Sequence, residues 1–163
     1  MFFISLYFFD FGVNMEREFI MIKPDGVQRG LIGDVIKRIE RVGLKIIGLK
    51  MLQLTKKMAE EHYAIHKGKS FYEGLIEYIT SGPVVAMVVE GKNAVKLTRK
   101  IVGATNPVDA QPGTIRGDFA LEIGRNIIHA GDSPENAKIE YSIYFDEEEF
   151  VQYQKIDEEW IYE

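Results

Sequence analysis

The feature that most constrains this chain is a set of short, continuous apolar runs, each next to a turn signal. Residues 19–22 read Phe-Ile-Met-Ile and end at a Lys-Pro-Asp-Gly sequence, and residues 84–89 follow Ser-Gly-Pro. Short runs of this kind are typical of strands that are buried on both faces. The Gly and Pro residues beside them mark the points where the chain turns.

Periodicity and caps predict the remaining elements. Residues 44–54 alternate as a strand, and Phe119, Leu121 and Ile123 alternate as another. Helical spacing of apolar residues begins at Ile32 and stops before Gly43. Further helices are expected at residues 55–66 after a Thr cap, at 70–79 after a capping box, at 92–101 before a glycine, and from the Asp-Ser-Pro-Glu of 132–135.

The order of these elements predicts an α+β fold. Strands and helices alternate, and a long loop precedes the last strand. This order suits a ferredoxin-like split β-α-β sandwich, in which helices pack on an antiparallel four-stranded sheet. The 163 residues suffice for one domain, and no linker divides them.

Composition excludes several classes of protein. There is no cysteine, which excludes disulfides, thiolate chemistry and Cys-based zinc sites and fits a reducing cytoplasm. The 20 Lys and Arg and 25 Asp and Glu give a net charge of −5, which argues against a polybasic binder of nucleic acid or membranes. A site for anions must therefore be a local concentration of cations.

The N-terminal residues 1–14 form an apolar extension to the domain expected at 15–163. There is no Lys or Arg before Arg17, and Asp10 interrupts the run, so it does not read as a signal peptide. It is an extra strand or packing segment, a weak membrane-surface segment, or the product of a start upstream of the biological one. We favour the third interpretation, because Met15 is followed at once by charged residues and a clean strand.

The loop at residues 103–117 is long and restrained by two prolines, which indicates an ordered binding loop or an ordinary surface loop. Thr105, Thr114 and Arg116, with Arg99 on the preceding helix, could donate hydrogen bonds to phosphate oxygens. The usual glycine-rich phosphate loops and dinucleotide fingerprint are absent. Any nucleotide site here is therefore of another kind.

His129 is the main candidate for chemistry. It follows two isoleucines and precedes a capped helix. A lone histidine is more often structural, but this one has Asp132, which could hold a cation through water, and Glu140, which could orient the ring. His62 and His66 lie one helical turn apart and are interpreted as a surface pair, since no nearby spacing supplies further metal ligands.

Several long motifs give the chain a specific resemblance. They are residues 23–30 (KPDGVQRG), 81–87 (SGPVVAM), 105–107 (TNP), 112–119 (PGTIRGDF) and 125–129 (RNIIH). In order and spacing they resemble the nucleoside diphosphate kinase family, from about Arg17 to Glu163. Residues 1–14 lie outside the resemblance.

The resemblance implies roles for individual residues. His129 matches the histidine that becomes phosphorylated, Glu140 the carboxylate that hydrogen-bonds it, and Asp132 the acidic residue near magnesium. Phe71 matches the aromatic residue on which the base stacks, with Ile123 across from it. The phosphate and sugar contacts would be Lys23, Tyr63, Arg99, Thr105, Arg116 and Asn126.

The implied reaction is ping-pong. A nucleoside triphosphate gives its γ-phosphoryl group to His129, and a nucleoside diphosphate removes it, with Mg²⁺ as cofactor. A base held mainly by stacking predicts low base specificity. The apolar C-terminus from Trp160 to Glu163 is expected to dock on something, and we favour a contact with another subunit. The resemblance implies a homo-oligomer, as in the hexameric members.

One position departs from the family pattern. The family usually reads His-Gly-Ser-Asp-Ser where this chain has His129-Ala130-Gly131-Asp132-Ser133. The missing serine normally supports the glutamate, so Glu140 is expected to be held less firmly. On this reasoning Gly131→Ser should raise the rate at which His129 is phosphorylated.

Two other classes of function compete with an active kinase. The first is a non-catalytic nucleotide-binding scaffold on the same fold, against which the joint presence of His129, Lys23, Arg116 and Glu140 argues. The second is nucleic-acid binding through the phosphate cleft, against which the net charge of −5 argues.

Overall fold

The computed structural model describes residues 14–163. In chain order its elements are β1 (Met15–Ile22), α1 (Pro24–Gln28), α2 (Ile32–Arg41), β2 (Lys45–Gln53), α3 (Lys56–His62), η1 (Ala64–His66), α4 (Tyr72–Ile79), β3 (Pro83–Lys92), α5 (Ala94–Val102), η2 (Pro107–Asp109), α6 (Ile115–Phe119), β4 (Ile128–Ala130), α7 (Pro134–Tyr144), η3 (Glu147–Glu149) and α8 (Glu158–Ile161), where η marks a 3-10 helix. The predicted N-terminal extension lies almost wholly outside the described residues, so its interpretation stays a prediction.

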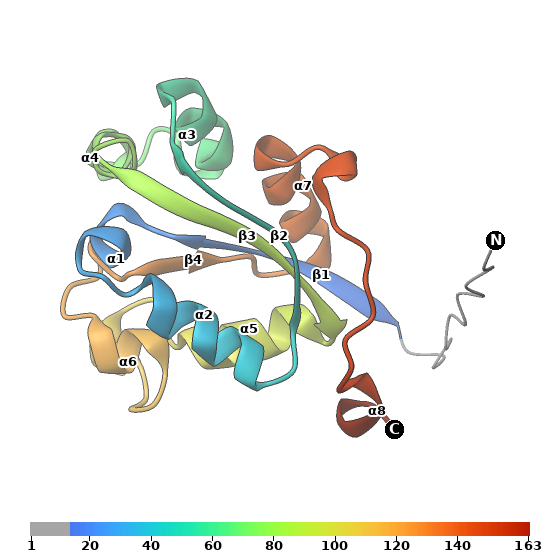
Figure 1. Cartoon of the computed structure of the whole chain (residues 1–163). Coiled ribbons are helices and arrows are strands. Elements are labelled where there is room, and N and C mark those ends of the chain that lie inside the picture. Colours follow the sequence, from blue (N-terminus) through green and yellow to red (C-terminus); the bar gives the residue numbers. More distant parts are fainter. Residues whose placement is uncertain (1–13) are drawn as a thin grey trace.

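The four strands form one antiparallel sheet in the order β2-β3-β1-β4 (Figure 1). β1 and β2 are consecutive strands, and β3 lies between them and pairs with both. This insertion is the split β-α-β arrangement of a ferredoxin-like fold. The predicted fold class is confirmed.

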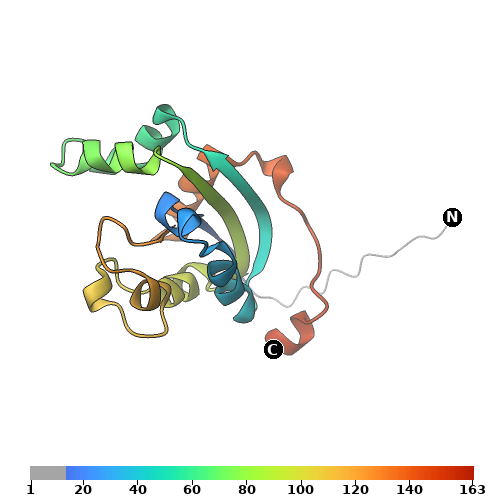
Figure 2. The same ribbon diagram turned by 60° about the vertical axis from the view of Figure 1, so that its left-hand side comes forward.

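Helices cover both faces of the sheet (Figures 1 and 2). Side chains alternate along β1, so Phe19 and Met21 join the apolar cluster that includes residues of α3, α4 and α7. Ile20 and Ile22 join a second cluster with residues of α2 and α5. Each of these four side chains is fully buried, and burial of a side chain of this size stabilises a protein by about 1.5–3 kcal/mol.

The predicted fourth strand is wrong. Phe119 ends α6, and Leu121 and Ile123 lie exposed in the irregular segment that follows. The fourth strand is instead Ile128–Ala130, which pairs with residues 20–22 of β1. An alternating pattern predicts a strand only where one face becomes buried, and here neither face does.

The predicted helix caps are correct at two of three positions. The Thr55 hydroxyl accepts a hydrogen bond from Met58 N, and Ser133 accepts one from Asn136 N. The capping box expected from Ser70 is wrong, because α4 begins one residue later, with Phe71 at its N-cap and no side-chain cap. Side-chain capping residues are favoured at helix starts but are not required there.

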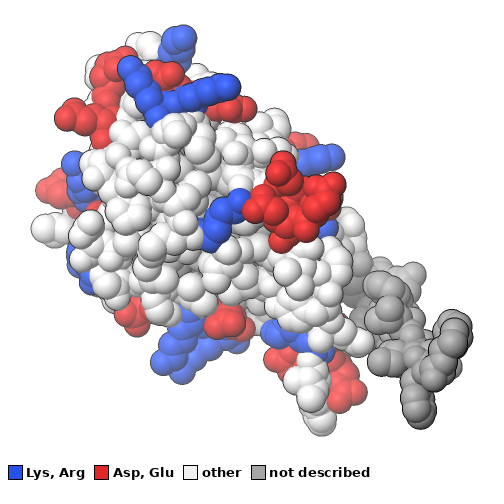
Figure 3. Space-filling view, turned by 45° about the horizontal axis from the view of Figure 1, so that its top comes forward, with Lys and Arg blue, Asp and Glu red and all other residues white. Residues whose placement is uncertain are grey.

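Charged side chains on the face shown in Figure 3 lie in separate groups, with uncharged surface between them.

The acidic run at residues 146–149 forms η3, which begins with a capping box between Asp146 and Glu149. All four of these residues are exposed. Among residues 14–163, no helix is long and apolar enough to cross a membrane.

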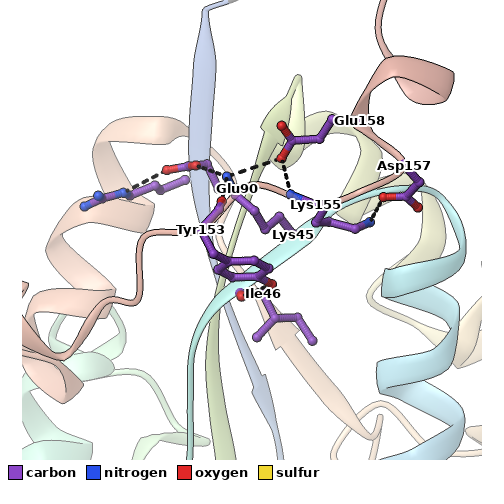
Figure 4. Close-up of polar contacts among 8 residues, drawn as sticks. Lys45, Ile46, Glu90, Tyr153, Lys155, Asp157 and Glu158 are labelled. Atoms are coloured by element: carbon purple, nitrogen blue, oxygen red, sulfur yellow. Dashed lines mark hydrogen bonds and ion pairs between the residues drawn. The ribbon is translucent and has the colours of Figure 1, made fainter. Parts of the chain in front are cut away.

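The C-terminal segment docks on its own chain beside β2. The Tyr153 hydroxyl donates to Ile46 O at 2.8 Å, and Lys45 Nζ lies 3.3 Å from a Glu90 oxygen and 3.6 Å from one of Glu158 (Figure 4). The Ile161 side chain covers Gly43. Docking of this terminus is therefore confirmed, but on its own chain; Trp160 is 84% exposed, and a subunit contact stays a prediction.

Gly48 allows the aromatic rings of the C-terminal third to approach the sheet. A Cβ on Gly48 would lie 3.1 Å from the Phe150 ring and 3.2 Å from the Phe145 ring, both of which are buried. We expect Gly48→Ala to lower the free energy of unfolding by roughly 1–3 kcal/mol, because the rings must shift. The matched control is Gly33→Ala in α2, where nothing lies within 4 Å. Gly33→Ala should leave stability equal or higher in urea denaturation, and equal stability of the two variants would contradict the prediction.

Candidate active site

His129 is the middle residue of β4, and its side chain lies on the opposite face of the sheet from those of its two neighbours. Its register partner on β1 is Met21, and its ring lies 6.1 Å from the ring of Phe19. The His129 side chain is 22% exposed. The imidazole is thus mostly buried, with its Nε2 away from solvent and a minor part of the side chain exposed.

Glu140 reaches the same place from α7. Its Oε2 lies 2.9 Å from Nε2 of His129, and its side chain is 17% exposed. Both atoms are buried without a hydrogen bond, so they are close but not yet aligned. The contact leaves Nδ1 as the ring nitrogen that is free to react.

Burial and nearby cations keep His129 neutral. Burial first, and then the charges of Lys23, Arg116 and Arg99, lower the pKa of His129 to about 3. Burial raises the pKa of Glu140 to about 7. An unprotonated imidazole has a lone pair for attack, and this site holds that form at neutral pH.

His62 packs directly against His129, and the prediction that it belongs to a surface pair is wrong. The two rings are 4.5 Å apart in an edge-on arrangement, and His62 is buried. Burial first, and then His129, lower the pKa of His62 to about 3. The spacing to His66 was misleading because α3 ends at His62 and the chain turns into η1.

The sequence did not predict that three side chains of the kinds that bind metals would lie together at this site. Nitrogen atoms of His62 and His129 and an oxygen atom of Glu140 lie within 4.8 Å of one another. The three residues come from α3, β4 and α7. A cation bound to all three would occupy the candidate nucleophile.

Lys23 and Asn126 form a buried pair close to the N-terminal end of β4. Lys23 directly follows β1 and is 8% exposed, and its Nζ donates to Oδ1 of Asn126. Nδ2 of Asn126 donates to the carbonyl of Thr105 at 2.8 Å. Burial first, and then the charge of Arg116, lower the pKa of Lys23 to about 8, so the amine is still largely charged at neutral pH.

Arg116 holds three segments of backbone together. It is 4% exposed and donates to the carbonyls of Gly103, Asn126 and Ile128 at 3.1, 3.3 and 2.7 Å. Burial, followed by the charge of Arg99, lowers its pKa to about 10, so it remains a cation. Thr114, expected as a phosphate donor, instead caps α6 and donates its hydroxyl to Gln111 O.

The backbone just before His129 is strained. Ile127 has a φ of +71°, which is costly for a β-branched residue, by about 1–3 kcal/mol. Its N–H donates to Asp25 Oδ2 at 3.0 Å, and its carbonyl accepts from Lys23 N at 2.8 Å. Asp25 also accepts a hydrogen bond from the Tyr78 hydroxyl.

Sequence reasoning missed Asp25 and Tyr78. Asp25 stands in the Lys-Pro-Asp-Gly sequence, which was interpreted only as a turn. The segment is in fact the start of α1, and its carboxylate fixes the strained residue before β4. Nothing local to Tyr78 indicated a role, because its partner is 53 residues away.

The remaining predicted site residues lie around this buried centre. Tyr63 is buried, with its ring 6.2 Å from that of His129, and Phe71 is 52% exposed and contacts His66. Asp132 is exposed and accepts a hydrogen bond from Asn136 Nδ2 at 2.6 Å. Arg99 is half-buried, Thr105 is exposed, and Ile123 is 56% exposed. The position of Ile123 across from Phe71 stays a prediction.

This fold and site define a class of protein. A ferredoxin-like sheet presents a neutral histidine, with one ring nitrogen against a carboxylate, next to Lys23, Arg99 and Arg116. Such an arrangement suits an enzyme that acts on a highly charged anion, and the phosphate chain of a nucleotide is an anion of this kind.

Comparison with known proteins identifies the family. The model for "Nucleoside diphosphate kinase" matches residues 16–150. A nucleoside diphosphate kinase of Archaeoglobus fulgidus is 62% identical over 149 residues, covering 91% of this chain and 99% of the relative, and one of Roseiflexus sp. is 59% identical, covering 91% and 100%. The chain therefore belongs to the nucleoside diphosphate kinase family and is an enzyme that transfers phosphate between nucleoside triphosphates and diphosphates.

Solved structures agree with this assignment. A halophilic nucleoside diphosphate kinase from Halobacterium salinarum, in complex with CDP, aligns with a TM-score of 0.89 at 47% identity, covering 92% of this chain and all of that one. A nucleoside diphosphate kinase family protein from Babesia bovis aligns with a TM-score of 0.88 at 46% identity, covering 90% and 99%.

The buried state of His62 predicts how stability depends on pH. Below the ordinary histidine pKa of 6.5, the unfolded chain binds a proton at His62 that the folded chain does not bind. Stability is therefore lost as pH falls, by up to about 1.4 kcal/mol per pH unit for this group. We expect His62→Phe to flatten the loss of Tm between about pH 7 and pH 5.

The matched control is His66→Phe, because His66 is partly exposed. It should keep most of the wild-type slope in the same thermal melts. Equal slopes for His62→Phe and the wild type would show that His62 titrates normally in the folded protein.

Proposed function

We propose that the enzyme works by a ping-pong mechanism through a phosphohistidine at His129. The observation that carries this is the contact between Nε2 of His129 and Glu140, in a pocket where the imidazole stays neutral. With Nε2 held by the carboxylate, Nδ1 attacks the γ-phosphorus of a nucleoside triphosphate, and the diphosphate leaves. A nucleoside diphosphate then takes the phosphoryl group back from Nδ1 by the reverse of this step.

Three cations would stabilise the phosphoryl group during transfer. Lys23 is charged and buried, and Arg116 is charged and held by three backbone carbonyls. Arg99 lowers the pKa of both His129 and Arg116, so its charge acts at the same place. Cations that are already positioned need little reorganisation as charge develops on the phosphoryl oxygens.

The donor set fits Mg²⁺. Asp132 places one exposed carboxylate three residues after His129, and Asn136 orients it. Mg²⁺ commonly keeps several waters and relies on few carboxylates together with substrate phosphates. Asp132 would hold the ion through water. When bound, Mg²⁺ would neutralise phosphate charge, and the residues of the chain do the positioning.

The nucleotide would bind with its base beside the exposed ring of Phe71. The base would stack on Phe71 opposite Ile123, while Tyr63, Thr105 and Asn126 contact sugar and phosphate. Stacking recognises the face that every base has, so we propose low base specificity. The neighbouring structure from Halobacterium salinarum contains CDP, a pyrimidine nucleotide.

A homohexamer in the cytoplasm remains part of the proposal. Large apolar side chains are exposed along edge strand β2 and the C-terminal segment: Leu49, Met51, Val151, Ile156 and Trp160. Exposed apolar surface of this kind favours a subunit contact. Light scattering that gives a monomer would contradict an assembly, and the lack of cysteine supports a reducing compartment.

A labelling and chase experiment tests the mechanism. The protein is incubated with Mg²⁺ and γ-labelled ATP, freed of nucleotide, and then given dGDP or CDP. We expect the labelled protein to return to its unmodified mass and to yield dGTP or CTP. Labelling should fail with His129→Ala and when the metal is removed by a chelator. An unlabelled wild-type protein that still binds nucleotide would favour the scaffold interpretation.

Stacking on Phe71 predicts a second result. Replacing Phe71 by Ala removes an aromatic surface worth about 1–3 kcal/mol per stacked base, so KM should rise by roughly tenfold or more for purine and pyrimidine nucleotides. Val42→Ala is the control, since Val42 is exposed at the end of α2. Unchanged KM values for Phe71→Ala in steady-state assays would exclude the stacking role.

A further inference from the structure

The space beside Gly131 is already occupied by Glu18. A Cβ on Gly131 would lie 2.5 Å from Oε1 of Glu18, closer than a carbon and an oxygen approach without a shift. Gly131 is buried where the chain leaves β4 for α7. The position that the family pattern gives to a serine is therefore filled here by a carboxyl group from β1.

Glu18 is held firmly in this position. It is 0% exposed, and its Oε1 accepts hydrogen bonds from Phe19 N at 2.6 Å and from Gly131 N at 3.0 Å. The Gly131 N–H also donates a hydrogen bond to Phe19 O at 3.2 Å. Because two backbone donors hold Oε1, it cannot move aside at little cost to admit a side chain at residue 131.

Glu18 stands between the two elements that meet at the active site. Gly131 is two residues after His129. A Cβ added at Gly131 would contact Ala137 of α7, the helix that carries Glu140. Charged groups from two helices act on Glu18, since Glu140 of α7 raises its pKa and Arg99 of α5 lowers it. The carboxyl group is thus bonded to the chain just after β4, and it occupies the space where a side chain of residue 131 would meet Ala137 of α7.

A buried carboxyl group in the middle of a strand is costly, so it needs a reason. Burial raises the pKa of Glu18 to about 8, so it is largely uncharged at neutral pH and adds little repulsion to Glu140. Oε2 is buried and has no hydrogen-bond partner among the described residues. An apolar residue would fill the volume without this cost, but it could not accept from the Gly131 N–H.

We propose that Glu18 is a positioning residue that takes the place of the family's serine and, by another contact, keeps Glu140 beside His129. By holding the Gly131 N–H, it fixes the turn between β4 and α7, and with it the distance between His129 and Glu140. This inference rests on the proposed phosphohistidine mechanism. It also reverses the expectation for Gly131→Ser, which alone would force Glu18 out of its site.

Single-turnover phosphorylation from γ-labelled ATP, at saturating nucleotide, tests the inference on four variants and the wild type. Glu18→Ala and Gly131→Ser should each slow labelling of His129 by about tenfold or more, with little change in the nucleotide concentration for half-maximal rate. The double variant Glu18→Ala/Gly131→Ser should recover to within about threefold of the wild type, since the serine then has room. Glu18→Gln should keep the rate, because its amide oxygen accepts the same two N–H groups.

Gly33→Ser is the matched control for adding a serine at an open glycine, and it should leave the rate unchanged. The inference would be overturned if both single variants label slowly and the double variant is slowed by the product of their two factors. A wild-type labelling rate for Glu18→Ala or for Gly131→Ser would overturn it as well. If Gly131→Ser does not fold, as judged by thermal melts, the contrast between Glu18→Ala and Glu18→Gln decides alone. A wild-type protein that takes no label would refute the proposed mechanism instead, and this inference with it.

Discussion

The site depends on the pairing of a three-residue strand, β4, with β1. So short a strand is weakly specified by its own ladder, and side chains from distant segments hold it at both ends. Asp25 accepts from the N–H of Ile127 before the strand, and Glu18 accepts from the N–H of Gly131 after it. Arg116 donates to the carbonyl of Ile128 within it. Buried polar groups that satisfy backbone in this way specify a single arrangement.

Burial of the site also sets the protonation states of His129 and Glu140. Removing His129 from water, beside three cations, holds its imidazole in the neutral form that a nucleophile requires. Burial also raises the pKa of Glu140 to about 7, near physiological pH. The cations that lower the pKa of the histidine are those that would bind the phosphate chain. In the proposed mechanism, one cluster of charges would therefore prepare the nucleophile and bind the substrate.

Most of the fold was predictable, because its signals are local. The buried strands, the Thr55 and Ser133 caps and the split topology follow from apolar runs, capping residues and element order. The fourth strand was not predictable, because three residues carry no periodicity and their pairing with β1 comes from a chain segment about a hundred residues earlier. An alternating pattern at residues 119–123 drew the prediction to a segment that stays exposed.

The sequence alone determined the family and the fold class, because the motifs that carry them are contiguous and specific. Only the tertiary structure decided how those residues act on one another. It buried His62 against His129, committed Arg116 and Thr114 to backbone partners, and filled the space at Gly131 with Glu18. Several of these outcomes depend on which side chains compete for one buried volume, and that competition involves distant segments, such as those of Glu18 and Gly131, which are 113 residues apart.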